Sequence, residues 1–151
     1  MATHRILAVA PPGRAPGWAD ALSSELGIPH FTLTALAREE ERRKTRLGRS
    51  ITESLMTGDF LDVRAVRLLV EDAVKRRGVE GFVLSGLPLD GALIDELAAG
   101  IAATHAVAAL GGLPERAVRT LDALRKRVKT LDVASDLPDA DVLRQAMAFL
   151  R

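Results

Sequence analysis

The stretch HRILAVAPPGRAPGWADALSSELGIPHF, residues 4–31, decides the fold of this chain. It opens with a short apolar run, RILAVA (5–10), and passes through a turn rich in proline and glycine. An amphipathic pattern follows over 16–26, and a second apolar run, HFTL, covers 30–33. This order of strand, turn, helix and strand predicts two parallel strands joined by a helix.

The same alternation continues to the end of the chain. Further apolar runs suited to buried parallel strands are GFVLSG (81–86), HAVAAL (105–110) and VKTLDV (128–133). Helical periodicity covers 34–44, 48–57, 62–77, 90–102, 114–127 and 138–150. We therefore predict an α/β fold, a three-layer sandwich with a five-stranded parallel sheet covered on both faces. We expect one domain over 1–151, with the helical stretch 34–80 as its long strand-free insertion.

Composition excludes several classes of function. The 151 residues carry a formal net charge of +1, which gives no reason to expect nucleic acid or a membrane surface as a partner. There is no cysteine, so disulfides and thiolate metal sites are excluded, as fits a reducing cytosol. No apolar run approaches membrane-spanning length and no signal-peptide pattern is present. We expect a cytoplasmic protein.

The turn in the opening stretch has the layout of a phosphate-binding loop, in which backbone N–H groups at a helix start hold a polyphosphate. In parallel sheets with helices on both faces, ligands bind at the carboxyl ends of the strands. Functional residues should therefore follow Ala10, Leu33, Leu84 and Leu110.

Four segments, in order along nearly the whole chain, resemble adenylate kinase and its nucleoside-monophosphate kinase relatives, which have a P-loop fold. APPGRAPGWADALSSELGIPH (10–30) is similar to the family's GPPGAGKGT-type loop with its helix, and FTLTALARE (31–39) to its ISTGDMLR motif. MTGDFLDVRAVRLLVEDAV (56–74) resembles the start of its G-x-L-V-P-D-x-x-V-x-x-L helix, and GFVLSGLPL (81–89) its GFLLDGFPR motif. The resemblance implies a phosphate- or nucleotide-binding set with no assigned catalytic residue: Gly13, Arg14, Gly17, Arg38, Gly86 and Arg125.

The loop departs from the family at its chemistry. Ala10 and Ala15 replace glycines, Pro16 replaces the lysine, and Trp18 replaces the threonine. Pro16 removes both the ammonium group and a backbone N–H, while its fixed φ suits the first turn of a helix. Phosphoryl transfer needs such positive charge and donors on the shifting oxygens, so ordinary ATP-dependent turnover is not expected. Arg14 is the residue that could compensate; its alternative role is a solvated turn arginine.

Two further arginines are retained. Arg38 matches the arginine that grips the AMP phosphate in the family, but it is equally a surface residue of a helix with pairs such as Glu39–Arg43. Arg125 matches the second of two helix arginines used around ATP. A basic helix end with Lys126, Arg127 and Lys129 is the simpler interpretation, because helix carboxyl termini favour cations.

Other family positions are lost. Leu89 stands at the arginine of the GFPR motif, Leu93 at the base-reading glutamine, and Leu121 at the first helix arginine. Ser85 replaces the acidic residue that organises the metal and its waters, so the charge that favours Mg²⁺ is missing. The lid and the arginine-bearing helix that shield ATP in the family are absent between residues 127 and 128.

The remaining polar candidates are few. The three histidines, which lie at or near strand starts, are expected at packing or solvent positions opposite the ligand edge: His4, His30 and His105. Asp132 is expected at the ligand end of the fifth strand, where it could cap a turn.

Two hypotheses follow. In the first, the chain is a degenerate adenylate-kinase-like domain without kinase activity that binds a phosphorylated small molecule, a nucleotide, a protein partner or a second copy of itself. Apolar surface near the cleft would come from Trp18, Leu87, Leu89 and Leu93. In the second, it is an atypical phosphotransferase, using ATP or AMP with Mg²⁺, whose charge clamp is Arg14, Arg38 and Arg125 converging on one cleft.

Overall fold

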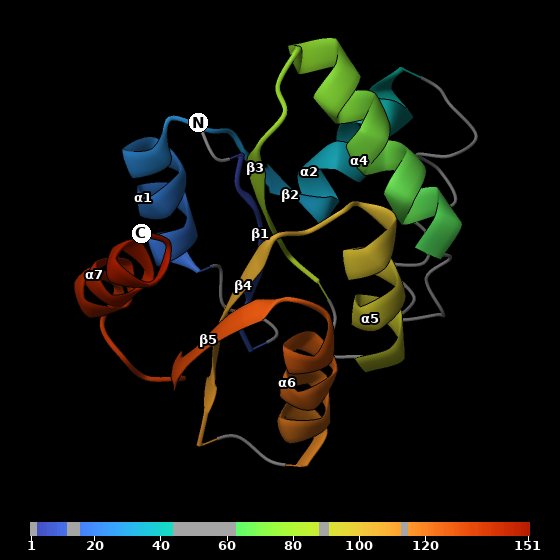
Figure 1. Cartoon of the computed structure of the whole chain (residues 1–151). Helices are drawn as coiled ribbons and strands as arrows, with labels where there is room; N and C mark the ends of the chain where they lie inside the picture. Colours follow the sequence, from blue (N-terminus) through green and yellow to red (C-terminus); the bar gives the residue numbers. More distant parts are fainter. Residues whose placement is uncertain (1–2, 12–15, 44–62, 88–90, 113–114) are drawn as a thin grey trace.

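The computed structural model of the chain describes residues 3–11, 16–43, 63–87, 91–112 and 115–151. It contains a five-stranded parallel sheet with the strand order β2-β3-β1-β4-β5 (Figure 1). The strands are β1 (Arg5–Val9), β2 (His30–Thr32), β3 (Phe82–Ser85), β4 (His105–Gly111) and β5 (Lys129–Ala134). The helices are α1 (Gly17–Leu26), α2 (Leu33–Arg42), α4 (Val63–Arg77), α5 (Gly91–Gly100), α6 (Glu115–Arg127) and α7 (Asp139–Phe149).

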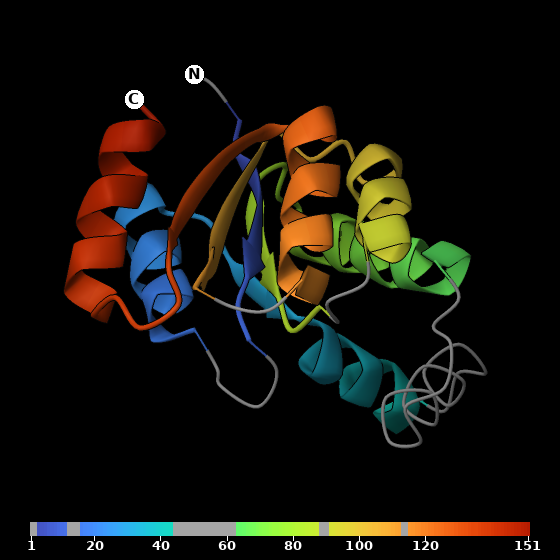
Figure 2. The same cartoon turned by 90° about the horizontal axis from the view of Figure 1, so that it is seen from below.

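Helices cover both faces of this sheet. Helices α1 and α7 lie side by side on one face, and α4, α5 and α6 form a layer on the other (Figures 1 and 2). Because successive side chains of a strand point to opposite faces, Ile6 and Ala8 of β1 pack toward α1 and α7, and Leu7 and Val9 pack toward the other layer. All four are at most 1% exposed, which explains why the central strand is apolar throughout.

The predicted elements are confirmed within one or two residues wherever the structure describes them. The predicted helix over 48–57 lies outside the described residues. None of the helices in the described part of the chain is long and apolar enough to cross a membrane.

Helices α2 and α4 are joined by ion pairs that differ from the predicted Glu39–Arg43 pair. The Arg43 guanidinium lies 3.6 Å from both Glu40 and Asp72, and Glu39 pairs with Arg76 of α4. A hydrogen bond with Glu40 and the charge of Arg76 lower the pKa of Asp72. The tertiary contact with α4 therefore outcompetes the local (i, i+4) pair on α2.

Candidate functional site

The connections of β1 and its neighbours diverge at the carboxyl edge of the sheet. The chain leaves β1 toward α1 on one face, whereas β3 and β4 lead to α5 and α6 on the other (Figure 1). Such a divergence opens a crevice at the ends of the strands, where ligands bind in this class of fold. The predicted residues Gly17 and Gly86 lie at this edge, next to the ends of β1 and β3.

The amino terminus of α1, where a polyphosphate would be expected, faces a carboxylate of the same chain. A Cβ atom on Gly17 would lie 2.5 Å from Oδ2 of Asp139, the first residue of α7. A larger residue at position 17 would therefore require the Asp139 side chain to move. Pro16 precedes it as the N-cap, makes no side-chain cap hydrogen bond and has no backbone N–H to offer. A helix amino terminus favours anions, so this end of α1 already has a carboxylate beside it, and the charge of Asp139 would oppose a phosphate at the same place.

One small depression beside this helix end is lined by described residues. Its volume is about 20 Å³, room for about one water molecule. Its walls include Ala10, Pro11, Pro16, Trp18 and Asp139. Trp18 itself is only 3% exposed and packs into the core between the sheet and helices α1 and α7.

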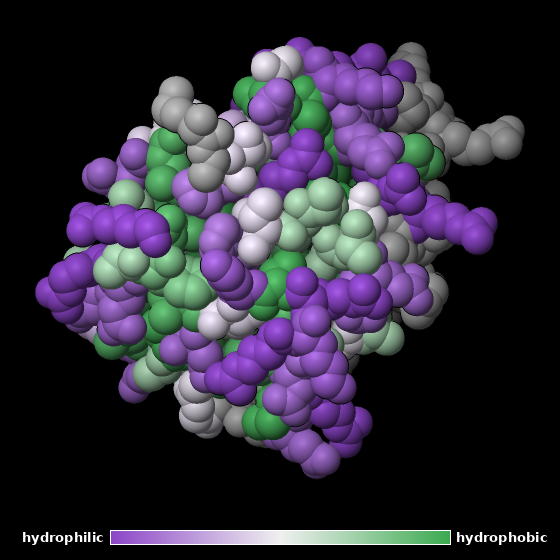
Figure 3. Space-filling model, in the orientation of Figure 1, coloured by the Kyte–Doolittle hydropathy of each residue, from purple (hydrophilic) through white to green (hydrophobic). Residues whose placement is uncertain are grey.

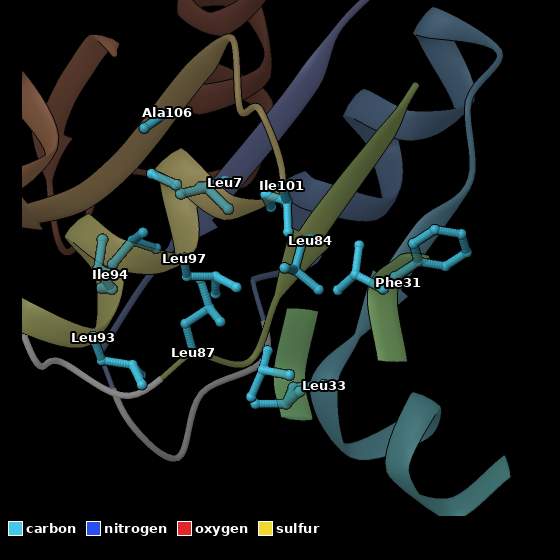
Figure 4. Packing of buried hydrophobic residues seen from close by; sticks show 14 of the residues in the cluster. Leu7, Phe31, Leu33, Leu84, Leu87, Leu93, Ile94, Leu97, Ile101 and Ala106 are labelled. Atoms are coloured by element: carbon cyan, nitrogen blue, oxygen red, sulfur yellow. The ribbon is translucent and has the colours of Figure 1, made fainter. Parts of the chain in front are cut away.

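On the other face, leucines fill the space at the carboxyl edge. Leu87 and Leu93 are 8% and 5% exposed and belong to one apolar cluster with Leu33, Leu84 and Leu97 (Figure 4). The prediction that Trp18, Leu87 and Leu93 form exposed apolar surface is therefore wrong, because all three are core residues; Leu89 lies outside the described residues. On the face drawn in Figure 3, hydrophilic side chains break up the apolar surface.

A hydrogen-bonded series of Asp20, His30 and Ser85 crosses the α1 face of the sheet, and no pattern in the sequence predicts it. His30 Nε2 lies 2.7 Å from Ser85 Oγ, and His30 Nδ1 contacts the Asp20 carboxylate. Because a carboxylate accepts, we assign the proton to Nδ1, so that Ser85 donates its O–H to Nε2. The parallel register explains the reach: His30 pairs with Val83, two residues before Ser85 on the same face.

The three hydrogen-bonded side chains have the acid–histidine–serine order of a hydrolytic triad, but here the serine is buried and the acid is exposed. Ser85 is 1% exposed, whereas the Asp20 side chain is 79% exposed. A nucleophile must reach its substrate, so the arrangement links α1, β2 and β3 and is not a reaction centre. It also corrects the expectation for His30, whose ring links the exposed Asp20 to the buried Ser85 by hydrogen bonds and is not at a simple packing or solvent position.

The two retained arginines lie toward opposite edges of the sheet. Arg38 is exposed on α2, which directly follows the edge strand β2. Arg125 of α6 lies 3.7 Å from Asp132 of β5, the other edge strand. Four strand spacings of about 4.8 Å, roughly 19 Å in all, separate β2 from β5. Gly13 and Arg14 lie outside the described residues.

The remaining polar candidates do not lie together. Asp132 pairs with Ala108 within the sheet and β5 continues to Ala134, so this carboxylate does not end the strand as expected. His4 and His105 lie at the amino edge with ring centroids 5.5 Å apart. In the part of the chain that the structure describes, no three His, Cys, Asp or Glu side chains cluster as metal ligands. With a neutral hydroxyl at Ser85, the described donors do not fit Mg²⁺.

The parallel sheet in the order β2-β3-β1-β4-β5, with helices on both faces, makes this an α/β domain consistent with a P-loop, nucleoside-monophosphate-kinase-like fold. In sequence, the chain is related to adenylate kinases. It is 34% identical over 86 residues to the adenylate kinase of Mycobacterium sp. (strain MCS), covering 56% of this chain and 48% of that one. The adenylate kinase of Anaeromyxobacter sp. (strain K) is 32% identical over 85 residues, covering 55% of this chain and 40% of that one.

The matches to these relatives are partial. The matched part of the chain spans less than half the length of either relative. The adenylate kinase of Nocardia farcinica gives the same picture, with 34% identity over 86 residues. No family model matches the chain. The relationship is therefore adenylate-kinase-like, and the activity of the complete relatives does not transfer with it.

Proposed function

We propose that this adenylate-kinase-like domain does not transfer phosphoryl groups and acts by binding a ligand or a protein partner. The observation that carries the proposal is the Asp139 carboxylate against Gly17 at the start of α1. A polyphosphate at this helix end would meet a negative charge, a proline without an N–H, and about 20 Å³ of open space.

Three further features support this proposal. The position of the base-reading glutamine, Leu93, is part of the core, and an apolar core side chain offers no hydrogen bond to a base. Arg38 and Arg125 lie toward opposite sheet edges, which argues against a single charge clamp. Helix α6 ends at Arg127 and β5 begins at Lys129, which leaves one residue where the family has a lid.

Calorimetric titration with ATP, ADP and AMP, each with and without Mg²⁺, tests the proposal. We expect no heat of binding from the unaltered chain. The Asp139→Asn variant removes the opposing charge and should gain measurable affinity for ATP. The matched control is Asp141→Asn in the same helix turn, which removes one negative charge as well. The Asp141 carboxylate pairs with Arg144 on α7 and not with the start of α1. This control variant should gain no affinity for ATP.

Micromolar affinity of the unaltered chain for ATP would contradict the proposal and favour the alternative, an atypical nucleotide-dependent phosphotransferase. In that case, Arg14→Ala and Arg38→Ala should each weaken ATP or AMP binding. An equal gain in Asp139→Asn and Asp141→Asn would show that net charge, and not the position of Asp139, limits binding.

A further inference from the structure

A second hollow lies at the opposite, amino end of the sheet, between α4 and the end of α5. Its volume is about 180 Å³, well above that of the depression beside α1. It is far from the proposed binding edge and independent of it, because the two hollows share no lining residue. The side chains that matter here are Arg5, Val70, Glu71, Val74, Lys75 and Ile101.

Arg5 brings a guanidinium that is already fixed in place. Its Nε donates to the backbone oxygen of Glu80 at 2.8 Å, and its Nη1 donates to the backbone oxygen of Ile101 at 2.9 Å. The group also lies over the Phe82 ring, 5.4 Å from its centroid. These two hydrogen bonds, both to described residues, use two of the five N–H donors of an arginine. The others can serve a ligand with little loss of side-chain freedom.

The charges around this hollow favour an anion. Lys75 is exposed at its rim and adds a second cation. Glu71 is the acidic residue of the lining, and its carboxylate lies 2.9 Å from Nε of Arg67, which offsets its charge. The Glu80 carboxylate is near Thr3, at 3.4 Å, and Arg5 contacts only its backbone oxygen. Cations therefore outnumber uncompensated carboxylates where a ligand would enter.

The rest of the lining is apolar. Val70 and Ile101 are 1% and 2% exposed, and partly buried Val74 packs against the same core cluster. A dry cavity of about 150 Å³ is enough to hold benzene, so 180 Å³ accommodates a body of about four to six carbons. The planar fork of an arginine matches a carboxylate in particular.

We propose that this hollow binds a small carboxylic acid, its carboxylate on Arg5 and Lys75 and its compact apolar body against Val70, Val74 and Ile101. Binding in this hollow does not depend on the site at the carboxyl edge of the sheet. Its ligand class is a branched or cyclic aliphatic monocarboxylate.

The test titrates the full chain with two probes, 3-methylbutanoate and its neutral analogue 3-methylbutanamide. Binding is followed by the chemical shifts of the protein's backbone amide groups. We expect saturable shifts on α4 and the end of α5 with a Kd of about 1 mM or below for the carboxylate. The amide should bind at least about tenfold more weakly, since it lacks the charge. Lys75 is exposed, so Lys75→Glu keeps the fold, and it should weaken carboxylate binding at least about fivefold. The matched control Lys126→Glu, on the exposed end of α6, should leave it unchanged.

A second variant, Val74→Phe, fills the hollow and should abolish binding while the chain stays folded. The proposal is overturned if the carboxylate gives no saturable shifts at about 20 mM, far above the expected Kd. It is also overturned if the amide binds equally well, or if Lys75→Glu and Lys126→Glu behave alike. Shifts confined to the carboxyl edge of the sheet would equally contradict it.

Discussion

Replacing Leu93 by glutamine tests whether position 93 belongs to the apolar core or reads the base of a nucleotide. Leu93 is 5% exposed on α5 and packs in the cluster with Leu87 and Leu97 (Figure 4). The change removes the burial of an aliphatic side chain, about 1.5–3 kcal/mol. It also buries an amide without a designed partner, about 1–3 kcal/mol more. We therefore expect Leu93→Gln to lower the free energy of unfolding by about 2.5–6 kcal/mol.

Urea unfolding followed by tryptophan fluorescence measures this loss. Trp18 is the chain's one tryptophan and lies in the core cluster on the other face, so it reports global unfolding without touching the mutated site. A loss of this size also lowers the melting temperature by about 10–15 °C in a domain of this length. Leu93→Met, which conserves volume, should cost less than about 1.5 kcal/mol.

The reasoning fails if Leu93→Gln is within about 1 kcal/mol of the unaltered chain, since a core amide cannot be that well tolerated. It fails equally if the variant gains affinity for AMP. Either result would mean that position 93 faces a ligand site and that its packing in the leucine cluster contributes little.

Three other perturbations follow from the structure. His30→Ala removes the acceptor of the buried Ser85 hydroxyl and should cost about 1–3 kcal/mol in chemical denaturation. Ala102 has φ +54° at the end of α5, where glycine is unstrained, so Ala102→Gly should raise the free energy of unfolding by about 0.5–1 kcal/mol. Burial, together with His4 and Lys129, holds the pKa of His105 below its ordinary 6.5. The unfolded chain then binds more protons below about pH 6.5, so stability should fall as the pH drops from there through the folded pKa.

Each of these has its own control. Asp20→Ala should cost less than about 1 kcal/mol because its carboxylate is exposed, and an equal loss in Asp20→Ala and His30→Ala would contradict the assigned bonding. Ala99→Gly, at an exposed position in the last turn of α5 where the backbone is helical, should instead destabilise by up to about 0.5–1 kcal/mol. His105→Asn should flatten the acid slope of stability; an unchanged slope would assign it to other groups.

The fold was predictable because one physical signal recurs along the chain. Apolar runs of strand length alternate with helical periodicity, and in the described residues each run became a strand of the parallel sheet. The loss of the family's polar positions could also be predicted from the sequence, since Pro16 stands at the family's lysine and Leu93 at its glutamine.

The site itself was less predictable, because its decisive contacts join distant residues. Nothing near Gly17 in sequence indicates that Asp139 lies against it; that contact follows from the packing of α1 on α7. His30 does lie at a strand start, as predicted, but β2 has only three residues, so this side chain reaches Ser85 at the end of β3. The leucines were predicted to form exposed surface because apolar character alone does not distinguish an exposed patch from a buried core.

The most direct measurement incubates the chain at high concentration with ATP, AMP and Mg²⁺ and follows the phosphorus resonances over time. We predict that both nucleotides persist unchanged, because the helix end that would hold the polyphosphate faces Asp139 and because Arg38 and Arg125 lie toward opposite edges of the sheet. Formation of ADP that scales with protein concentration and disappears in the Arg38→Ala variant would contradict it.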